Sequence, residues 1–471
     1  MKIAVLNGSP KGAQSVTLRY AKFLENNFPD HSFNYFNVAQ DISRLEKDAA
    51  FFDKTLGAIA SGDIVLWAFP LYVCLPSSQQ KRFIELLFER GAAKFLAGKF
   101  AAVLTTSLHY FDHTAHQYMR AICDDLNMKF TDYFSAEMYG LLQETERKNL
   151  LLFAGNVLAK ARNNAPEPKQ YSPLQSRTFN YAPDKNIVPL NAPNGKKIII
   201  LHDSDGQDGN LLKMVFVMEK HFGGLAETVN IHEIDIKGGC LGCIKCAHRN
   251  ICVYQDGYMN FCETRLMPSD VIIMAGKIKD RALSAKWKMF IDRSFYNTHR
   301  PVFANKQFAY IISGPLEKIP FQREIMEGHT TCGGANLAGI VTDESADSKI
   351  IDQELRTLAE NCLNFSETNY MRPAMFAGAC ARKLFRDAVW GELRCVFTGD
   401  HKFYKKHGMY DFPQYKLKNW LSNIFLAPLL NIPFIRKQFE SRMKTGMTAP
   451  LDKFLSKNKK TAGRSMPSRR R

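Results

Sequence analysis

The sequence predicts an α/β protein with two doubly wound parallel sheets, each with strand order 2-1-3-4-5, followed by a basic C-terminal extension. Three observations lead to this prediction. Short apolar runs alternate with amphipathic stretches along residues 1–162, which is typical of a parallel sheet covered by helices on both faces. The same alternation restarts at residue 196 and repeats unit for unit, which indicates an internal duplication. Residues 371–471 keep neither the alternation nor the composition of the two halves.

The first half opens with an apolar run, Lys2–Ser9, that ends in a turn. Its predicted strands cover residues 2–9, 32–38, 63–72, 99–108 and 129–141. Its predicted helices cover residues 15–27, 45–61, 77–91, 114–127 and 143–163. The strand at 63–72 (DIVLWAFPLY) is continuously apolar, which indicates burial on both faces of the sheet.

A proline-rich segment separates the halves. Six of the chain's 20 prolines lie in residues 163–195, where the periodicity disappears, and we interpret this segment as an extended linker. The later predicted strands cover residues 196–202, 227–235, 270–278, 307–315 and 336–342, and the helices 210–222, 256–266, 284–296, 319–329 and 348–365. The predicted domains are therefore 1–162 and 196–370, each of ordinary domain size, with the extension at 371–471.

The composition limits the class of protein. Charged residues make up 23% and aromatic residues 12% of the 471 positions, which argues against wholesale disorder. No run of 18 apolar residues predicts a transmembrane helix, and the first residues favour a strand over a signal peptide. Eleven cysteines without an export signal favour reduced thiols or metal ligands over disulfides. We expect a cytoplasmic protein.

The loop after the first strand, Asn7–Thr17, is rich in glycine and hydroxyl groups and opens a helix. Backbone N–H groups and the helix dipole favour an anion at such a position. The loop lacks the Gly-Lys-Ser/Thr ending of a nucleoside triphosphate loop, so a terminal phosphate is the expected ligand. The candidate ligands of that phosphate are Ser9, Lys11, Ser15 and Thr17. The alternative is a plain turn with a helix cap.

Two further loops are expected at the same edge of the first sheet, where doubly wound sheets bind their ligands. Pro70, Leu71, Tyr72 and Val73 lie at the carboxyl end of the third strand and form a rigid shelf that suits a planar ring. Thr105, Thr106 and Ser107 lie at the carboxyl end of the fourth strand and are polar. Together the three loops predict a site for a planar ring that carries a phosphate.

The first domain resembles the NAD(P)H-dependent FMN reductases of the flavodoxin-like superfamily. The resemblance rests on NGSPKGAQSVT, AFPLYVCLPSSQQKRFIELL and the polar loop at the end of the fourth strand. The resemblance covers nearly all of residues 1–162, although the family's FIDR-like helix is here Phe83-Ile84-Glu85-Leu86. It implies FMN as cofactor, NAD(P)H as co-substrate, and a homodimer with the flavin near the interface. By this resemblance the first loop holds the FMN phosphate, residues 70–73 line the isoalloxazine, and residues 105–107 close the site.

Four cysteines follow the second strand of the second half with the spacing C-x2-C-x2-C-x5-C. They are Cys240, Cys243, Cys246 and Cys252. Soft sulfur ligands at this density suit an iron–sulfur cluster or zinc, and free thiols are the alternative. Over residues 196–367 the sequence resembles the iron–sulfur flavoproteins, whose helix also matches Lys288–Arg293. That resemblance implies a [4Fe–4S] cluster.

The flavin loops of the second half are degraded. Its first loop, 203–210, carries Asp203, Asp205 and Asp208, which would repel a phosphate, and its shelf is replaced by Lys277–Arg281. The Asp-rich loop does not have the residues of an EF-hand and favours a solvated turn. We therefore expect FMN in the first domain. Among the scattered cysteines Cys74 is a candidate contact of the flavin or substrate, because it follows the shelf directly, with a packing role as the alternative. The others are expected to be buried packing residues. His109 and His113 lie near the third loop and are expected at the surface, with a proton-donor role as the alternative.

The charge is concentrated in the extension. Residues 371–471 contain 22 Lys and Arg against 6 Asp and Glu, whereas the first 370 residues have a net charge of +1. Apolar and aromatic residues between 419 and 437 are interrupted by prolines and flanked by basic residues, which suits an anionic membrane surface. Packing against the two domains is the alternative. Nucleic acid is disfavoured because no recognised motif accompanies the charge. Residues 456–471 are expected to be disordered.

The expected function is a flavin-dependent oxidoreductase. A nicotinamide would pass hydride to FMN in the first domain, and the electrons would continue to a small acceptor such as a quinone or to an iron–sulfur centre in the second domain. The alternatives are an electron carrier that does not react with NAD(P)H, and a non-catalytic module that tethers membrane or RNA. The expected location is the cytoplasm, with peripheral contact to the inner face of the membrane.

Overall fold

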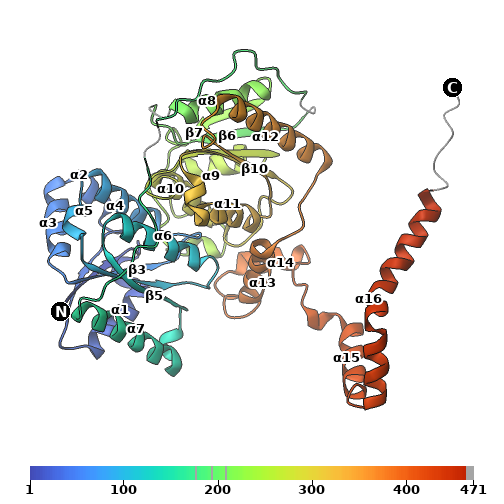
Figure 1. The fold of residues 1–471 in the computed structure, drawn as a ribbon, viewed down its shortest axis with the longest axis horizontal. Coiled ribbons are helices and arrows are strands. Elements are labelled where there is room, and N and C mark those ends of the chain that lie inside the picture. Colours follow the sequence, from blue (N-terminus) through green and yellow to red (C-terminus); the bar gives the residue numbers. More distant parts are fainter. Residues whose placement is uncertain (176–177, 192–194, 207–208, 463–471) are drawn as a thin grey trace. The chain divides into compact units, whose positions relative to one another are not determined.

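A computed structural model describes residues 1–175, 178–191, 195–206 and 209–462. The chain divides into two compact units, residues 1–404 and residues 405–471. The first unit contains both sheets and the helices that cover them (Figure 1).

The first sheet has the strand order β2-β1-β3-β4-β5, and all its strands are parallel, as predicted. Its strands are β1 (Lys2–Asn7), β2 (Ser32–Phe36), β3 (Ile64–Pro70), β4 (Phe100–Thr106) and β5 (Lys129–Ala136). Helices α1 (Val16–Asn27) and α7 (Glu144–Arg162) cover one face. The other face is covered by α3 (Ala49–Ala60), α4 (Ser78–Glu89) and α6 (Asp112–Asp125). The shorter α5 (Ala93–Leu96) follows α4.

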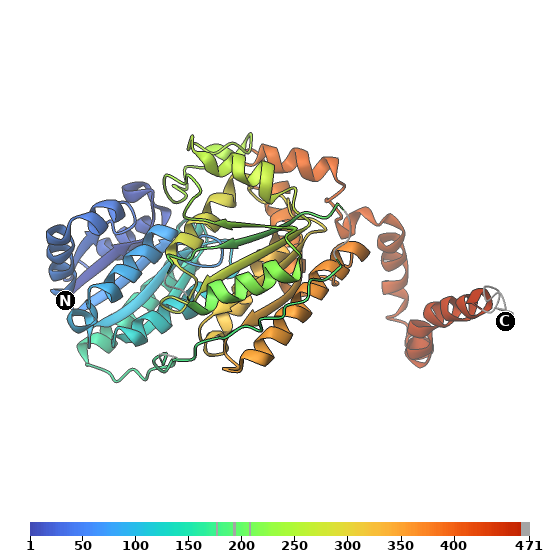
Figure 2. The same ribbon diagram turned by 90° about the horizontal axis from the view of Figure 1, so that it is seen from above.

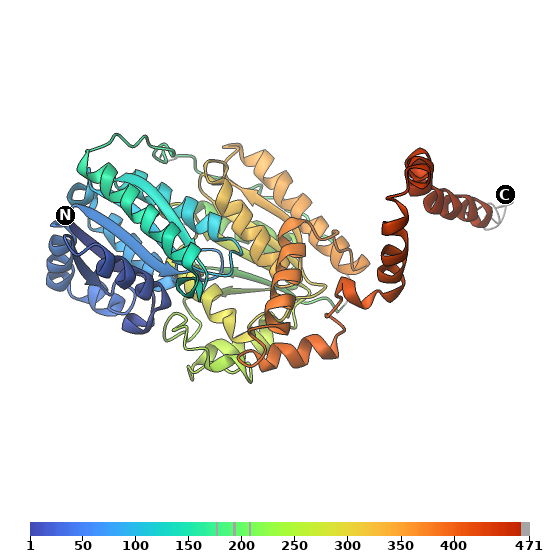
Figure 3. The same ribbon diagram turned by 90° about the horizontal axis from the view of Figure 1, so that it is seen from below.

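The second sheet repeats this arrangement. Its strands are β6 (Ile198–His202), β7 (Ala226–Asn230), β8 (Val271–Lys277), β9 (Gln307–Ser313) and β10 (Asn336–Thr342). They are parallel in the order β7-β6-β8-β9-β10, which is again 2-1-3-4-5 and confirms the predicted duplication of the fold. Helices α8 (Gly209–His221) and α12 (Ser348–Thr368) cover one face. The other face is covered by α9 (Gly257–Phe261), α10 (Ala285–Arg293) and α11 (Pro320–Cys332). Figures 2 and 3 show helices on both sides of each sheet.

Three predicted helices are divided in the structure, and the one expected over 284–296 is α10 followed by a 3-10 turn, Ser294–Asn297. The helix expected over 45–61 is divided into α2 (Ile42–Lys47) and α3, because Asp48 ends one and caps the other by accepting from the Phe51 amide at 2.9 Å. The helix expected over 256–266 is α9 followed by a π-helical turn, Cys262–Leu266.

The two domains pack through helices that occupy the same place in each duplicated unit, α4 against α10 and α6 against α11. At the start of α4, the Ser78 amide donates to Asp292 of α10 at 2.8 Å. At the start of α10, the Ala285 amide donates to Glu85 of α4 at 2.6 Å. Each carboxylate therefore caps the partner helix, and the two contacts are related by an approximate twofold axis.

Two buried lysines follow the same symmetry. Lys81 lies four residues after the cap Ser77, and Lys288 lies four residues after the cap Ser284. The Lys81 Nζ donates to the carbonyl of Lys279 at 2.9 Å, and the Lys288 Nζ donates to the carbonyl of Tyr72 at 2.7 Å. The interface is thus built like that of a symmetric dimer, although both halves belong to one chain.

The hydrophobic core on this face of the first sheet continues into the second domain. Ile319, Phe321 and Ile325, at the start of α11, belong to the same buried cluster as α4 and α6. Ala377 of α13 (Phe376–Trp390) also belongs to it. Helix α13 and most of α14 (Thr398–Lys406), which lie within the predicted extension, therefore belong to the first compact unit.

The domain interface contains a buried carboxyl group, that of Asp280, whose ionisation is unfavourable in the folded protein. Burial raises the pKa of Asp280 to about 6, with Lys81 acting in the opposite direction, and among the described residues its Oδ2 has no hydrogen-bond partner. At pH 7.5 the carboxyl is ionised in both the folded and the unfolded protein, and its burial makes this ionisation destabilise the folded state. Well below pH 4 the carboxyl is protonated in both states.

We expect Asp280→Asn to stabilise the protein at pH 7.5 by about 1–3 kcal/mol, and by almost nothing at pH 3.5. Asparagine also tolerates the positive φ of 46° at this position. Thermal unfolding of both proteins at the two pH values measures the difference. An equal gain at both values would assign the effect to packing instead of charge.

The predicted linker is held against the second domain. Tyr181 is fully buried, its amide donates to Asn210 at 2.8 Å, and its hydroxyl donates to Asp352. The described residues of 163–195 form no helix or strand, as expected for an extended segment, and they run along the outside of the first unit (Figure 2).

The second unit contains α15 (Leu417–Leu429) and α16 (Pro433–Ala462). Because α16 continues to Ala462, the prediction of disorder is wrong for residues 456–462, whose lysines and alanine favour a helix. Residues 463–471, and the predicted carboxylate at Asp208, lie outside the described residues.

Candidate functional site

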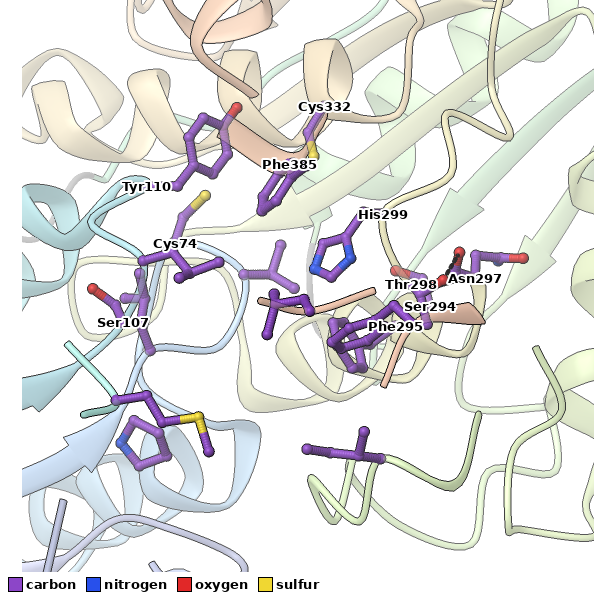
Figure 4. Close-up of a pocket in the computed structure, with 18 of the residues that line it drawn as sticks. Cys74, Ser107, Tyr110, Ser294, Phe295, Asn297, Thr298, His299, Cys332 and Phe385 are labelled. Carbon is purple, nitrogen blue, oxygen red and sulfur yellow. Dashed lines mark hydrogen bonds between the residues drawn. The ribbon is translucent and has the colours of Figure 1, made fainter. Parts of the chain in front are cut away.

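A cavity of about 490 Å³ lies at the carboxyl edge of the first sheet, and we refer to it as the chamber. Its volume is typical of small-molecule sites, which span about 300–1,000 Å³. One wall comes from the three predicted loops of the first domain, and the opposite wall comes from the second domain, α13 and the turn that follows α13. In Figure 4, Cys74, Ser107 and Tyr110 lie across the chamber from His299 and Phe295.

The loop after β1 is shaped by Asn7. Its side chain accepts from the Ser9 amide at 3.1 Å and donates to the Gly12 carbonyl at 3.1 Å. Gly12 has a φ of +56°, which favours glycine, and a Cβ there would meet the Gln40 side chain. Ser15 is the N-cap residue that precedes α1, and its buried Oγ has no hydrogen-bond partner within the described residues. The unpaired hydroxyl and the free amides of the first turn form a ready anion cradle.

The shelf after β3 keeps a strained backbone. The Leu71 amide donates to the Thr106 carbonyl at 3.0 Å, which ties the shelf to the third loop. Val73 and Cys74 have φ values of +32° and +66°, which non-glycine residues rarely adopt. The Thr114 hydroxyl donates to the Cys74 carbonyl at 2.8 Å and fixes this turn.

The structure brings most of the predicted cofactor-binding residues to the chamber. Those that line it are Ser9, Lys11, Ser15, Pro70, Leu71, Val73, Thr106 and Ser107. Three others lie behind this wall. Thr17 is buried, with its hydroxyl 2.6 Å from that of Thr106, and the Thr105 hydroxyl lies 2.8 Å from His116 Nε2. Tyr72 turns its ring toward the second domain.

The opposite wall was not predicted. Its central residue is His299, whose Nδ1 lies 2.9 Å from the fully buried carboxylate of Asp400. The imidazole stacks on Phe385, with ring centroids 4.5 Å apart, and meets the edge of Phe397 at 4.7 Å. The Tyr404 hydroxyl donates to the His299 carbonyl at 2.7 Å. The ring is therefore held in one orientation, with Nδ1 occupied by the carboxylate.

The predicted histidines lie elsewhere. His109 pairs with Asp112 at 2.9 Å, which raises the pKa of His109, and His113 pairs with Glu324 at 2.9 Å. Both side chains are about half exposed and neither lines the chamber, in agreement with the prediction of surface residues.

Two cysteines face the chamber from opposite domains. Cys74 lines it as expected, and Cys332, at the end of α11, lines it although it was interpreted as a packing residue. Burial raises the pKa of the Cys332 thiol to about 12 and that of Cys74 further. Both thiols are therefore protonated near neutral pH and contribute apolar surface.

The four clustered cysteines line one small cavity, together with Arg293, Phe295 and Tyr296. In the described part of the chain, no three His, Cys, Asp or Glu side chains converge closely enough to hold a single metal ion. Whether these four thiols bind an iron–sulfur cluster, bind zinc or remain free therefore stays a prediction.

This cysteine loop, residues 240–252, lies directly against the first domain. The Gln79 side chain donates to the Cys240 carbonyl at 3.1 Å. A Cβ at Gly242 would lie 2.0 Å from the Tyr72 hydroxyl, so glycine allows the shelf to approach the loop. Ile244 and Phe295 line both the cysteine cavity and the chamber.

The matching place in the second domain is closed. Arg281 lies three residues before its helix cap, as Cys74 does in the first domain. It is fully buried, forms two 2.6 Å hydrogen bonds to Asp125, and donates to the Ser172 carbonyl of the linker at 2.5 Å. The arginine side chain thus fills the edge where a second planar ring would lie.

The family described as having a flavodoxin-like fold matches residues 1–151, which confirms the predicted fold of the first domain. No curated protein matches the chain. Similar solved structures include an NADH:FMN oxidoreductase in its apo form (19% identity, TM-score 0.30), which covers 36% of this chain and 91% of its own. The match to an FMN-dependent NADH-azoreductase from Bacillus anthracis in complex with FMN has 14% identity and a TM-score of 0.27, and it covers 35% of this chain and 100% of the azoreductase chain. The match to an NADPH-quinone reductase from P. pentosaceus has 16% identity and a TM-score of 0.24, and it covers 36% of this chain and 99% of the reductase chain.

Proposed function

We propose that the protein is a flavin-dependent oxidoreductase that binds one FMN in the chamber, is reduced by NAD(P)H and reduces a small quinone-like acceptor. The observation that carries this proposal is the meeting of an anion cradle, a rigid shelf and a polar loop at one cavity, closed by a histidine–carboxylate pair from the other domain.

The chamber fits FMN by the chemistry of its donors. The unpartnered Ser15 hydroxyl, the first-turn amides of α1 and Lys11 match a phosphate, and Pro70, Leu71 and Val73 match the face of a planar ring. When bound, FMN supplies hydride and single-electron chemistry that side chains cannot provide. The protein supplies binding, orientation and a proton.

His299 is the group placed to deliver that proton. Asp400 accepts a hydrogen bond from the Nδ1–H, which leaves Nε2 on the side of the ring away from the carboxylate. A doubly protonated His299 ring can then release its Nε2 proton to a reduced acceptor oxygen, while Asp400 holds the Nδ1–H and the orientation of the ring.

The walls define the class of acceptor. Phe295, Phe385 and Phe397 surround His299, and Leu393 and Val396 continue the apolar surface. Aromatic walls of this kind bind planar, uncharged rings, and a single positioned donor orients one oxygen of such a ring. A quinone has both features.

The test is an absorption spectrum of the purified full-length protein with FMN quantified, followed by NADH and NADPH oxidation with a benzoquinone as acceptor. We expect about one FMN per chain and steady oxidation. Steady NADPH oxidation would exclude a carrier that does not react with nicotinamide. A protein that neither retains nor rebinds FMN would contradict the proposal and support the tethering alternative.

An iron–sulfur centre as electron acceptor is a second candidate, favoured by the two wall residues that the chamber and the cysteine cavity share. Cys240, Cys243, Cys246 and Cys252 would hold the cluster, which would supply a one-electron site beside the flavin.

For this candidate we expect about four irons and four sulfides per chain after anaerobic purification, which is the content of one [4Fe–4S] cluster. Cys243→Ser should lose the iron and keep the FMN. Cys395→Ser, at another exposed cysteine, is the matched control and should lose neither. Iron-free protein with full FMN content would contradict this candidate and leave the four cysteines as free thiols or zinc ligands.

A further inference from the structure

The last two helices carry large apolar side chains that nothing covers within their own unit. None of the described residues between 405 and 462 is buried. The exposed side chains include Trp420 (51%), Phe425 (69%), Phe434 (70%) and Met447 (72%). We refer to α15 and α16 together as the terminal helix pair.

The apolar residues follow helical spacing. On α15, Leu417, Leu421 and Ile424 lie on one face, while Lys418 and Ser422 lie on another. On α16 a row with a spacing of four residues runs along the helix, formed by Phe439, Met443, Met447, Leu451 and Leu455. Isolated helices of α15's length are marginal in water, because most helix stability comes from packing an apolar face. The terminal helix pair therefore needs a partner.

The charge of the unit indicates which partner. Residues 405–471 contain 16 Lys and Arg against 3 Asp and Glu, a net charge of +13. Basic residues adjoin the apolar ones, as Arg436 and Lys437 follow Phe434. The partner must present both an apolar layer and a high density of negative charge.

An anionic bilayer surface has both properties. Aromatic and leucine side chains enter the boundary between headgroups and acyl chains, and lysines and arginines remain among the anionic headgroups. In the described residues no helix has the length and apolarity needed to cross a bilayer, and α15 and α16 contain Pro428 and Pro450. We propose that the terminal helix pair docks the protein on the surface of an anionic membrane and lies in the plane of the interface.

Two other partners satisfy only half of these requirements. Nucleic acid would neutralise the charge but leave the apolar rows in water. A second copy of this chain would bury the apolar rows but bring two units of +13 together. The bilayer surface satisfies both requirements at once. The proposal does not depend on the flavin chemistry.

The test is co-sedimentation of the full-length protein with vesicles of phosphatidylcholine alone and of phosphatidylcholine with about one third phosphatidylglycerol. We expect binding to the anionic vesicles at least about tenfold tighter than to the neutral ones, falling as salt is raised from 50 to 500 mM. Equal binding to both vesicles, or to neither, would overturn the proposal.

Two variants separate the apolar and charged contributions. Phe425→Ser and the pair Arg436→Glu with Lys437→Glu should each weaken binding to anionic vesicles at least about tenfold. The matched controls are Leu142→Ser, at a side chain that is 78% exposed in the first unit, and Lys148→Glu on α7; neither should change vesicle binding. A thermal melt of each variant reports folding of the first unit.

Size-exclusion chromatography and binding of a single-stranded RNA complete the test. A vesicle-independent dimer that Phe425→Ser dissociates would identify a second copy as the partner. Tight RNA binding that persists in Phe425→Ser, without vesicle binding, would identify nucleic acid. Either result would overturn the proposal.

Discussion

Replacing Ser15 with aspartate is expected to lower the affinity for FMN by at least about 100-fold. Ser15 precedes α1, and its buried hydroxyl lines the chamber without a partner among the described residues. A carboxylate there would face the phosphate dianion, and two like charges about 4 Å apart near a protein surface repel by about 4 kcal/mol. Aspartate is also a favourable N-cap residue, so α1 should keep its stability and only the affinity for FMN should fall.

Fluorescence titration of the FMN-free protein measures this loss, and a thermal melt confirms the fold. Ser43→Asp adds the same charge at an exposed position in the first turn of α2 and should bind FMN as the wild type does. Unchanged affinity in Ser15→Asp would place the phosphate away from this loop.

The second large effect is expected at His299. His299→Gln keeps a polar side chain of similar size but removes the proton donor, and general acids contribute about 10²- to 10⁴-fold to rates. We expect turnover with a benzoquinone to fall at least about 100-fold. Turnover with ferricyanide, which accepts an electron and no proton, should change less than about threefold.

The two acceptors distinguish proton delivery from damage to the site. His113→Gln is the matched control, because His113 is about half exposed, pairs with Glu324 and does not line the chamber. An equal loss with both acceptors would make His299 a structural residue. No loss with either would remove the histidine from the reaction.

The first wall of the chamber could be predicted because its residues are local in sequence. Each predicted loop follows an apolar strand directly, and parallel strands end at the same edge of a sheet. Ser9, Pro70 and Thr106 therefore reach one cavity, as expected. Thr105 and Thr106 show the limit, because alternating side chains of a strand point to opposite faces and Thr105 turns to His116.

The second wall could not be predicted in the same way. His299 lies 101 residues before Asp400, and neither belongs to a motif. The contact between them depends on how α14 packs on the second domain, and no local sequence pattern predicts that packing. Cys332 is similar, since an isolated cysteine in a helix is usually a packing residue and only the domain interface turns it toward the chamber.

The duplicated fold was predicted from repeated periodicity, but the interface between the copies was not. Lys81 and Lys288 are buried charges on helices whose sequences read as surface helices. Their partners, the carbonyls of Lys279 and Tyr72, belong to the opposite domain. Helix α13 is a related case, because its amphipathic face acquires a partner only when both domains are present.

The reciprocal contacts between α4 and α10 have a consequence for the division of labour within the chain. In a symmetric dimer of identical chains, each residue occurs once in each of the two sites. A substitution that improves one site therefore changes the other site as well. Joining the two copies removes this constraint. Here one edge keeps a shelf of Pro70 and Leu71, while the matching edge is sealed by Arg281 and Asp125. One half has specialised in holding a ligand and the other in facing it.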